Sequence, residues 1–399
     1  MFRHLLKLTW KRKSRNLMLS LEILLAFAIV FAVAAFGLRY LQLYRMPLGF
    51  EGADVWSVAI QPGDNGKQRF DDAVYDSFRR GLAELPEVGG VAFTNIEPYS
   101  MSTMSGDMRR KAGSREVPTE LAEADDKLAA VLGLNLVEGR WFSQLDNGSA
   151  QRPVVINRRM AEAMFPGERA LGQLFIEGEG AAPAQAYRVV GVVDAYRAKG
   201  ELAGPVNFAF MRLEAGKNDN DARIMLLKVR AGTARDFERR LNARLKLIRN
   251  DWSFQIAPLS SSRASMIRTQ TVPLIVIGII AGFMLLMVAF GLFGALWQNT
   301  TQRIPEIGLR RAIGAGAADI YRQIVAEQFM LSSIAIVFGL ALLVQLPLTG
   351  AFGESLNWPV FLGAALLSMA VIYLLSLLCA VYPGWRASRL SPTEALHYE

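Results

Sequence analysis

The chain has 399 residues, 52% of them hydrophobic, and a formal net charge of +8 at pH 7. A chain of this length has room for two or three domains. Its single cysteine, Cys379, excludes an internal disulfide and any metal site built on paired cysteines.

The first element in chain order is an apolar segment at residues 17–38. Residues 1–16 before it contain several lysines and arginines and no acid. The segment has the approximately 20 apolar residues that a helix needs to cross a bilayer, and it exceeds the roughly 7–15 residues of a cleaved signal core. We therefore expect an uncleaved membrane helix, with a cleaved signal peptide as the alternative. Glu22 lies near the start of this helix and is expected to reach the membrane surface.

Residues 39–271 are long enough to form a domain of their own, and their pattern is mixed α+β. Residues 53–60 and 186–193 are predicted to be strands. Two helices are predicted from apolar stripes, which consist of Phe70, Val74, Phe78 and Leu82 in the first and of Phe237, Leu241, Leu245 and Ile248 in the second. Thr233 and Asp236 predict a capping pair at the start of the second helix.

We find no residues for catalysis in this domain. The only two histidines, His4 and His397, lie near the chain ends, which excludes a Ser-His-Asp or Cys-His site outside the membrane and most zinc hydrolases. The acid pairs Asp71-Asp72 and Asp125-Asp126 are interpreted as solvated surface. The acids around residues 219–221 are interpreted as a polar loop rather than a calcium site. No catalytic, cofactor or metal site is therefore predicted, and a membrane-anchored enzyme is the weakest interpretation.

Three further apolar segments follow, at residues 272–297, 324–348 and 360–381, and each is long enough to span a bilayer. Residues 298–323 and 349–359 connect them, and residues 382–399 form the tail. Gly278 and Gly282 give the second segment a spacing of small residues that indicates either a helix–helix interface or plain flexibility. Glu327, near the start of the third segment, is either a functional group or a side chain that reaches the membrane surface.

Among the termini and the short connections that flank the four segments, lysines and arginines lie on one side. They occur in residues 1–16, 298–323 and 382–399, whereas residues 349–359 contain none. The positive-inside rule therefore predicts cytoplasmic termini and an extracytoplasmic domain at residues 39–271. The predicted fold class is α+β, with four transmembrane helices in a 1+3 arrangement and a large mixed α+β extracytoplasmic domain between helices 1 and 2. Because topology explains the positive charge, we expect the lipid bilayer, and no nucleic acid, as a partner.

Residues 303–315, RIPEIGLRRAIGA, are predicted to form a short helix. Pro305 suits its first turn and Gly314 its end. Glu306 and Arg310 are four residues apart and can pair. Its apolar side consists of three isoleucines, Ile304, Ile307 and Ile313. Two interpretations stay open at this point: a helix on the inner leaflet with its arginines on lipid phosphates, or a knob that docks into a groove of a cytoplasmic partner.

The same segment resembles the signature of the FtsX-like permease domain of ABC permeases, with the pattern R-x-x-E-I-G-x-x-R-A-I-G-A. The tail YPGWRASRLSPTEALHYE is similar to the end of MacB-type permeases. The stretches LGLNLVEGRWFS, PVVINRRMAEAMFP, ALGQLF and YRVVGVV resemble the MacB periplasmic core domain. The resemblance implies a set of ATPase-coupling residues, namely Arg303, Glu306, Ile307, Gly308, Arg310, Arg311, Ala312, Gly314 and Ala315. It leaves Glu327, Gly278 and Gly282 as further candidates for coupling or helix packing.

The resemblance also implies a function. It predicts a non-catalytic permease subunit of the bacterial inner membrane that transmits ATP-driven movement to its periplasmic domain and so drives export or extraction of a substrate. MacB carries an ATPase ahead of its first helix, whereas only residues 1–16 precede it here. A separate cytoplasmic ATPase that binds ATP and magnesium is therefore expected, with no cofactor in this chain.

Further expected partners are a second permease subunit, identical or different, and as candidates a periplasmic adaptor and an outer-membrane channel. Two alternatives stay open. The first is an FtsX-like regulator that activates an external partner and transports nothing. The second is a lipoprotein-releasing permease. The sequence leaves the substrate open between a peptide, a lipid-linked molecule and an antibiotic.

Overall fold

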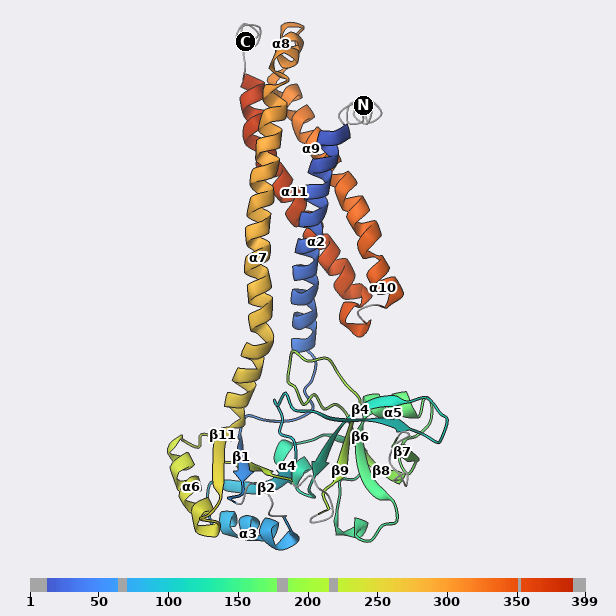
Figure 1. Ribbon diagram of the computed structural model, residues 1–399, viewed down its shortest axis with the longest axis vertical. Helices are drawn as coiled ribbons and strands as arrows, with labels where there is room; N and C mark the ends of the chain where they lie inside the picture. The colour runs from blue at the N-terminus through green and yellow to red at the C-terminus, as the bar shows by residue number, and fades with distance from the viewer. Residues whose placement is uncertain (1–12, 64–69, 178–185, 215–221, 351–352, 390–399) are drawn as a thin grey trace. The chain divides into compact units, whose positions relative to one another are not determined.

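The computed structural model describes residues 13–63, 70–177, 186–214, 222–350 and 353–389 (Figure 1). The chain divides into two compact units. One contains Met1–Gln42 and Thr271–Glu399, and the other contains Leu43–Gln270. Each unit is described by itself below. The acids predicted to form a polar loop at residues 219–221, and both histidines, lie outside the described residues.

The first unit is helical. Its helices are α2 (Lys13–Tyr44), α7 (Leu259–Thr301), α8 (Ile304–Ala312), α9 (Ala317–Leu343), α10 (Gln345–Thr349) and α11 (Trp358–Arg389), with a 3-10 turn η2 (Gly353–Leu356) before α11. Within the described chain, four stretches are long and apolar enough to cross a membrane, and they comprise α2, α7, α9 with α10, and α11. The four predicted membrane helices are thus confirmed as candidate spans. The helices are longer than the apolar segments, because polar residues beyond the segment ends continue the helical backbone hydrogen bonding.

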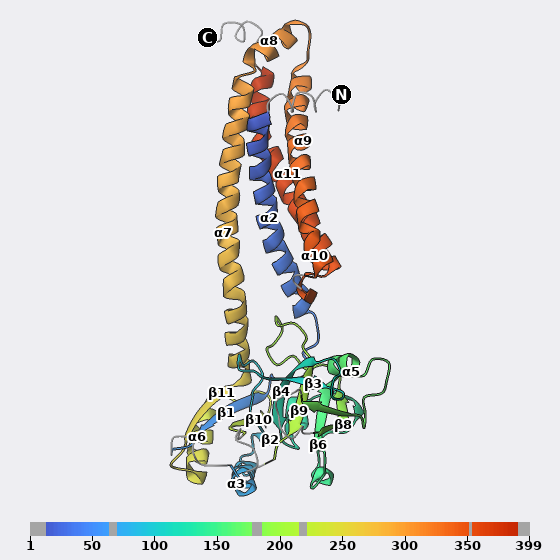
Figure 2. The same cartoon turned by 45° about the vertical axis from the view of Figure 1, so that its right-hand side comes forward.

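The bundle is packed through its apolar faces and a few buried polar groups. Ile23 and Phe27 of α2 lie against Leu292 of α7 and Ile336 of α9 in one buried cluster. Helices α9 and α11 run side by side, as Figure 2 shows. Between them the buried hydroxyls of Ser332 and Ser376 form a 2.7 Å hydrogen bond, an arrangement that holds membrane helices together.

The second unit is a mixed α+β domain. Its strands are β1 (Val55–Gln61), β2 (Val88–Thr94), β3 (Met104–Arg109), β4 (Val117–Ala124), β5 (Leu136–Gly139), β6 (Arg152–Asn157), β7 (Leu174–Glu177), β8 (Ala186–Val193), β9 (Phe208–Arg212), β10 (Ile224–Val229) and β11 (Ser253–Pro258). Its helices are α3 (Asp72–Ala83), α4 (Leu128–Leu132), α5 (Arg158–Met164) and α6 (Asp236–Ile248), with a 3-10 turn η1 (Gln144–Asp146). This architecture, inserted between the first and second spanning helices, confirms the predicted fold class.

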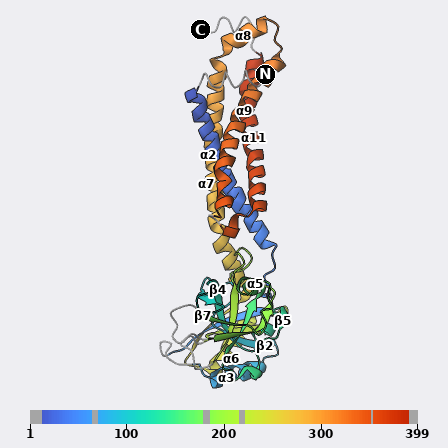
Figure 3. The same ribbon diagram turned by 90° about the vertical axis from the view of Figure 1, so that its right-hand side faces the viewer.

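The strands form one sheet in the order β11-β1-β10-β2-β4-β3-β7-β8-β6-β9, with β5 beside β8 and a further β4–β9 pairing. Alternation along the strands gives each face its own core. In β10, Met225 and Leu227 pack toward α3 and α6, whereas Leu226 belongs to the core around α4. Figure 3 shows α3 and α6 together at one end of the domain. Val74, Phe78 and Leu82 of the first predicted stripe and Phe237, Leu241 and Leu245 of the second are buried in this core. Phe70 is also buried but precedes α3, and Ile248 is only partly buried.

The predicted capping pair of Thr233 and Asp236 is wrong. Helix α6 begins at Asp236 with Arg235 as its N-cap, and the cap makes no side-chain hydrogen bond. The Thr233 hydroxyl instead donates 2.6 Å back to the carbonyl oxygen of Arg230. A local turn thus uses the hydroxyl that would otherwise cap the helix.

Candidate functional site

Helix α8 forms where the sequence predicted a short helix. Pro305 lies in its first turn, where a missing N–H costs no helical hydrogen bond. Glu306 lies in the first turn and Arg310 in the last, which complements the helix dipole. Gly314 follows the helix with φ +103°, a backbone conformation that favours glycine. The local sequence therefore sets both ends of α8.

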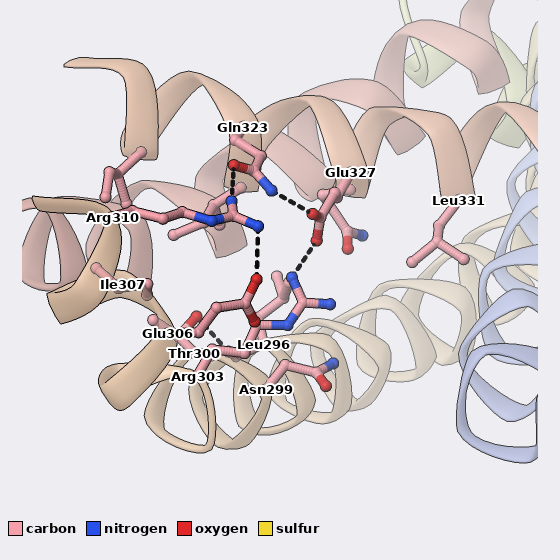
Figure 4. A pocket seen from close by; sticks show the side chains of 13 residues that line it. Leu296, Asn299, Thr300, Arg303, Glu306, Ile307, Arg310, Gln323, Glu327 and Leu331 are labelled. Carbon is pink, nitrogen blue, oxygen red and sulfur yellow. Dashed lines mark hydrogen bonds and ion pairs between the residues drawn. The ribbon is translucent and has the colours of Figure 1, made fainter. Parts of the chain in front are cut away.

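A chain of polar contacts fixes α8 against α9 (Figure 4). The Arg303 guanidinium donates to Glu327 at 2.6 Å, and the Gln323 amide donates to the same carboxylate at 3.0 Å. Arg310 donates to the Gln323 amide oxygen at 2.6 Å and to Glu306 at 2.5 Å. The predicted Glu306–Arg310 pair is confirmed. Glu327 belongs to the same network through Arg303 and Gln323.

The two ion pairs of this network differ in strength. The side chains of Arg303 and Glu327 are 23% and 21% exposed, whereas those of Arg310 and Glu306 are 39% and 48% exposed. An exposed pair contributes about 0–1 kcal/mol, and a shielded pair costs more when one partner is removed. The Arg303–Glu327 pair is thus the firmer attachment of α8.

Helix α8 is also attached to α11. The Arg311 guanidinium donates to the carbonyl oxygen of Ser388. Ile307 packs with Ile320 and Ala387 in a small buried cluster between α8, α9 and α11. Gly308 is buried in the same face of α8. Arg303 at the N-cap, and Arg310 and Arg311 of α8, all donate to groups of this chain. The interpretation that these arginines lie on lipid phosphates is therefore disfavoured.

A small hollow lies between α7, α8 and α9 beside this network (Figure 4). Its empty space is about 70 Å³, far below the roughly 300–1,000 Å³ of a site that encloses a small molecule. Gln328 lines it and is 1% exposed, and within the described chain its amide oxygen and nitrogen have no hydrogen-bond partner. The hollow is therefore too small to enclose a transported molecule.

The outer face of α8 is apolar and exposed. Leu309 is 57% exposed and Ile313, four residues later, is 79% exposed. Ala312 lies exposed between them. Leu309 had no predicted role. The predicted apolar side of Ile304, Ile307 and Ile313 is wrong for Ile313, which lies away from the two buried isoleucines. The i, i+4 spacing places Leu309 and Ile313 on one face, opposite Ile304 and Ile307, and packing against the bundle decides which of the two faces is exposed.

The remaining predicted site residues have different surroundings. Gly314 is exposed and Ala315 is half-buried after α8. A Cβ added at Gly278 or Gly282 would meet nothing within 4 Å in the described chain, so this spacing makes no helix contact inside the chain. The close approaches occur elsewhere in the bundle, where a Cβ at Gly291 would meet the Glu22 carboxylate and one at Gly339 would meet the Phe27 ring.

The acid pairs of the α+β domain serve its structure. Asp71 caps α3 by accepting the Val74 N–H at 2.9 Å. Asp125 is 4% exposed and pairs with Arg79 at 2.9 Å, so its interpretation as solvated surface is wrong. Burial raises the pKa of Asp125, against the lowering effect of Arg79. Among the described residues there is no group of three or more His, Cys, Asp or Glu side chains that could hold a metal.

The fold and this site define a multi-pass membrane protein with a large α+β domain between its first two spanning helices. The family model of the MacB-like periplasmic core domain matches residues 20–243, and that of the FtsX-like permease C-terminal domain matches residues 278–392. The chain belongs to the family of MacB-like and FtsX-like ABC transporter permeases.

Similar proteins include the ABC transporter permease YknZ of Bacillus subtilis, which is 24% identical over 97% of this chain and 96% of its own length. The pyoverdine export ATP-binding/permease protein PvdT of Pseudomonas putida is 28% identical over 66% of this chain, which spans only 40% of PvdT. Among solved structures, the periplasmic region of MacB from Actinobacillus actinomycetemcomitans is 16% identical with a TM-score of 0.39, over 56% of this chain and 97% of that chain.

Proposed function

We propose that this protein is the permease subunit of an ABC transporter and that α8 is its contact with a separate cytoplasmic ATPase, which binds ATP and magnesium. The similarity to YknZ along nearly the whole of both chains supports this division, because YknZ is named as a permease alone. In this proposal both chain termini and α8 face the cytoplasm, and the α+β domain faces the periplasm. The distribution of lysine and arginine supports that orientation.

The observation that carries the proposal is the contrast between the two faces of α8. Its inner face is fixed by Arg303, Arg310 and Arg311, whereas its outer face exposes Leu309 and Ile313. A short helix held by polar contacts, with apolar residues outward, is suited to dock into an apolar groove of a partner. Because the inner contacts reach α9 and α11, a push on α8 would be carried into the bundle.

The proposed output is movement of the α+β domain, which would drive export or extraction of a substrate outside the membrane. Relatives whose names state a transport role, PvdT for pyoverdine export and MacB of Bdellovibrio bacteriovorus for macrolide export, support export as the direction. A second permease subunit, and a periplasmic adaptor with an outer-membrane channel, belong to the same proposal. ATP can drive this movement only if the two conformations of the permease differ in affinity for the closed ATPase.

The test compares two double variants of the full chain, each co-expressed with its partner ATPase. Leu309→Ser/Ile313→Ser removes the outer apolar face of α8 and leaves the inner network intact. The matched control is Leu174→Ser/Leu247→Ser. It changes a leucine of β7 that is 41% exposed and a leucine of α6 that is 78% exposed. We expect the α8 variant to lose affinity for the ATPase by about tenfold or more, as truncation of apolar contact residues does. Co-elution and ATP hydrolysis are measured, and unchanged values for the α8 variant would refute the proposal.

A further inference from the structure

A row of aromatic rings crosses from α7 to α11 near the end of the bundle that carries α8. The Trp297 ring stacks on Tyr382 with centroids 5.7 Å apart and an interplanar angle of 10°. Phe293 extends the row at 6.3 Å from Trp297, and Trp385 extends it at 6.4 Å from Tyr382. Tyr382 and Trp385 are 48% and 47% exposed. The row is therefore an open surface rather than part of the bundle core.

Two arginines lie on this row. The Arg386 guanidinium lies 4.6 Å from the centroid of Trp297, and that of Arg389 lies 4.5 Å from the centroid of Trp385. Both side chains belong to exposed residues, and neither forms an ion pair with an acid among the described residues. They differ in this from Arg303 and Arg310, whose guanidinium groups bind carboxylates of the same chain. Arg386 and Arg389 thus present their charge outward.

The surroundings of this aromatic–arginine surface are those of a membrane boundary. Tryptophan and tyrosine prefer the depth of the lipid headgroups, and arginine there meets phosphate. Phe290, one turn before Phe293 in α7, is 65% exposed, and Leu378, four residues before Tyr382 in α11, is 62% exposed. These apolar side chains continue from the row along the two spanning helices, where a lipid acyl chain would lie. An exposed apolar surface that continues along the spanning helices fits a lipid as the bound partner, and not a soluble protein.

We propose that the aromatic–arginine surface of Trp297, Tyr382, Trp385, Arg386 and Arg389 binds the headgroup of an anionic phospholipid. The planar guanidinium groups donate paired hydrogen bonds to phosphate oxygens. The rings beneath them stack on each guanidinium and hold it at headgroup depth. Only the assignment of the bound lipid to the cytoplasmic leaflet rests on the proposed orientation. The inference does not depend on the ATPase.

The experiment titrates the purified full chain in a nonionic detergent with phosphatidylglycerol or phosphatidylcholine and counts bound lipids by native mass spectrometry. We expect the wild type to prefer phosphatidylglycerol. Arg386→Gln/Arg389→Gln should weaken phosphatidylglycerol binding about thirtyfold, because each cation near an anionic lipid surface contributes about fivefold. Binding of phosphatidylcholine should not change. Arg386→Lys/Arg389→Lys should recover part of the loss, because lysine keeps the charge without the planar fork.

The matched control is Arg80→Gln/Arg239→Gln, which removes two exposed arginines of the α+β domain and leaves the spanning helices unchanged. It should leave phosphatidylglycerol binding unchanged. Wild-type phosphatidylglycerol affinity in the Arg386→Gln/Arg389→Gln variant would overturn the inference. If that variant instead lost the ATPase while still binding the lipid, the surface would belong to the protein partner. If the Arg386→Gln/Arg389→Gln variant fails to fold, the Arg386→Lys/Arg389→Lys variant still tests the inference. Equal affinity of the lysine variant for phosphatidylglycerol and phosphatidylcholine would overturn the inference.

Discussion

Asp146 is the residue for which the structure makes the clearest pH prediction. Its carboxylate accepts two hydrogen bonds from the Arg140 guanidinium, at 2.7 and 2.6 Å, and one from the Ser143 N–H at 3.0 Å. The hydrogen bond from Arg140, followed by that from Ser143, outweighs burial and lowers the pKa of Asp146. A carboxylate whose pKa is lower in the folded state stabilises the fold above its unfolded pKa, and this contribution is lost as the pH falls through the folded value.

We therefore expect Asp146→Asn to destabilise the protein at neutral pH by about 1.5–3 kcal/mol, the range for a hydrogen bond to a charged group. The difference from wild type should shrink as the pH falls from about 4, the ordinary aspartate pKa, toward the lower folded-state pKa of Asp146, below which the wild-type carboxylate is neutral as well. Thermal unfolding of the purified full chain across this pH range measures it. Asp194→Asn is the control, because its pair with Arg158 is 44–53% exposed and contributes little. A difference between Asp146→Asn and wild type that does not vary with pH would contradict the prediction.

Single residues also show where sequence reasoning reached its limit. The Glu306–Arg310 pair could be predicted because i, i+4 neighbours meet on any helix. The partner of Glu327 could not, because Arg303 lies 24 positions away and meets it only after α8 folds against α9. The direction of Leu309 and Ile313 depended in the same way on which face of α8 packs against the bundle. A helical period predicts that two faces exist and leaves open which one the neighbours cover.

Among the elements, the connection at residues 195–203 joins three parts of the α+β domain. Arg197 is 3% exposed, and its five N–H donors reach four backbone carbonyls, including those of Leu43, in the last turn of α2, and Met46. Glu201 accepts from Arg263 in the first part of α7. Lys199 pairs with Glu120 of β4 at 2.7 Å. The connection therefore attaches the end of α2 and the beginning of α7 to the sheet.

Arg197→Lys should loosen all of these attachments together. Lysine has three donors in place of five and no planar fork, so buried carbonyls are left without partners at about 1–3 kcal/mol each. Hydrogen exchange should become faster, by about tenfold or more, at residues 43–50 and 259–270 as well as at 195–203. Arg188→Lys, at an exposed arginine of β8, is the control. Faster exchange at residues 195–203 alone would show that the connection does not join the two helices.

This connection was not predicted from the sequence, although several periodic elements of the domain were. Strand β8 and helices α3 and α6 follow from period-2 and period-3.6 patterns over 8–13 residues. Residues 195–203 have no period, and their role comes from contacts with Leu43, Glu120 and Arg263, which are distant in sequence. Local patterns identify elements that bury a face, whereas a segment held by long-range hydrogen bonds leaves no periodic signal.

For the whole molecule, α7 is the element that relates the two ends of the proposed mechanism. It is one helix of 43 residues, Leu259–Thr301, that begins beside Glu201 and ends directly before α8. If α8 receives the movement of an ATPase, this helix carries it to residues 195–203.

With the ATPase bound, we expect a non-hydrolysable ATP analogue to change the hydrogen exchange of residues 195–203 in the wild type by about threefold or more, which corresponds to a shift of about 0.7 kcal/mol in local opening. In Leu309→Ser/Ile313→Ser the change should disappear, and in the Leu174→Ser/Leu247→Ser control it should persist. A response that survives loss of the α8 face would mean that the movement enters the bundle somewhere other than α8, whereas no response in the wild type would mean that the ATPase does not move this domain at all.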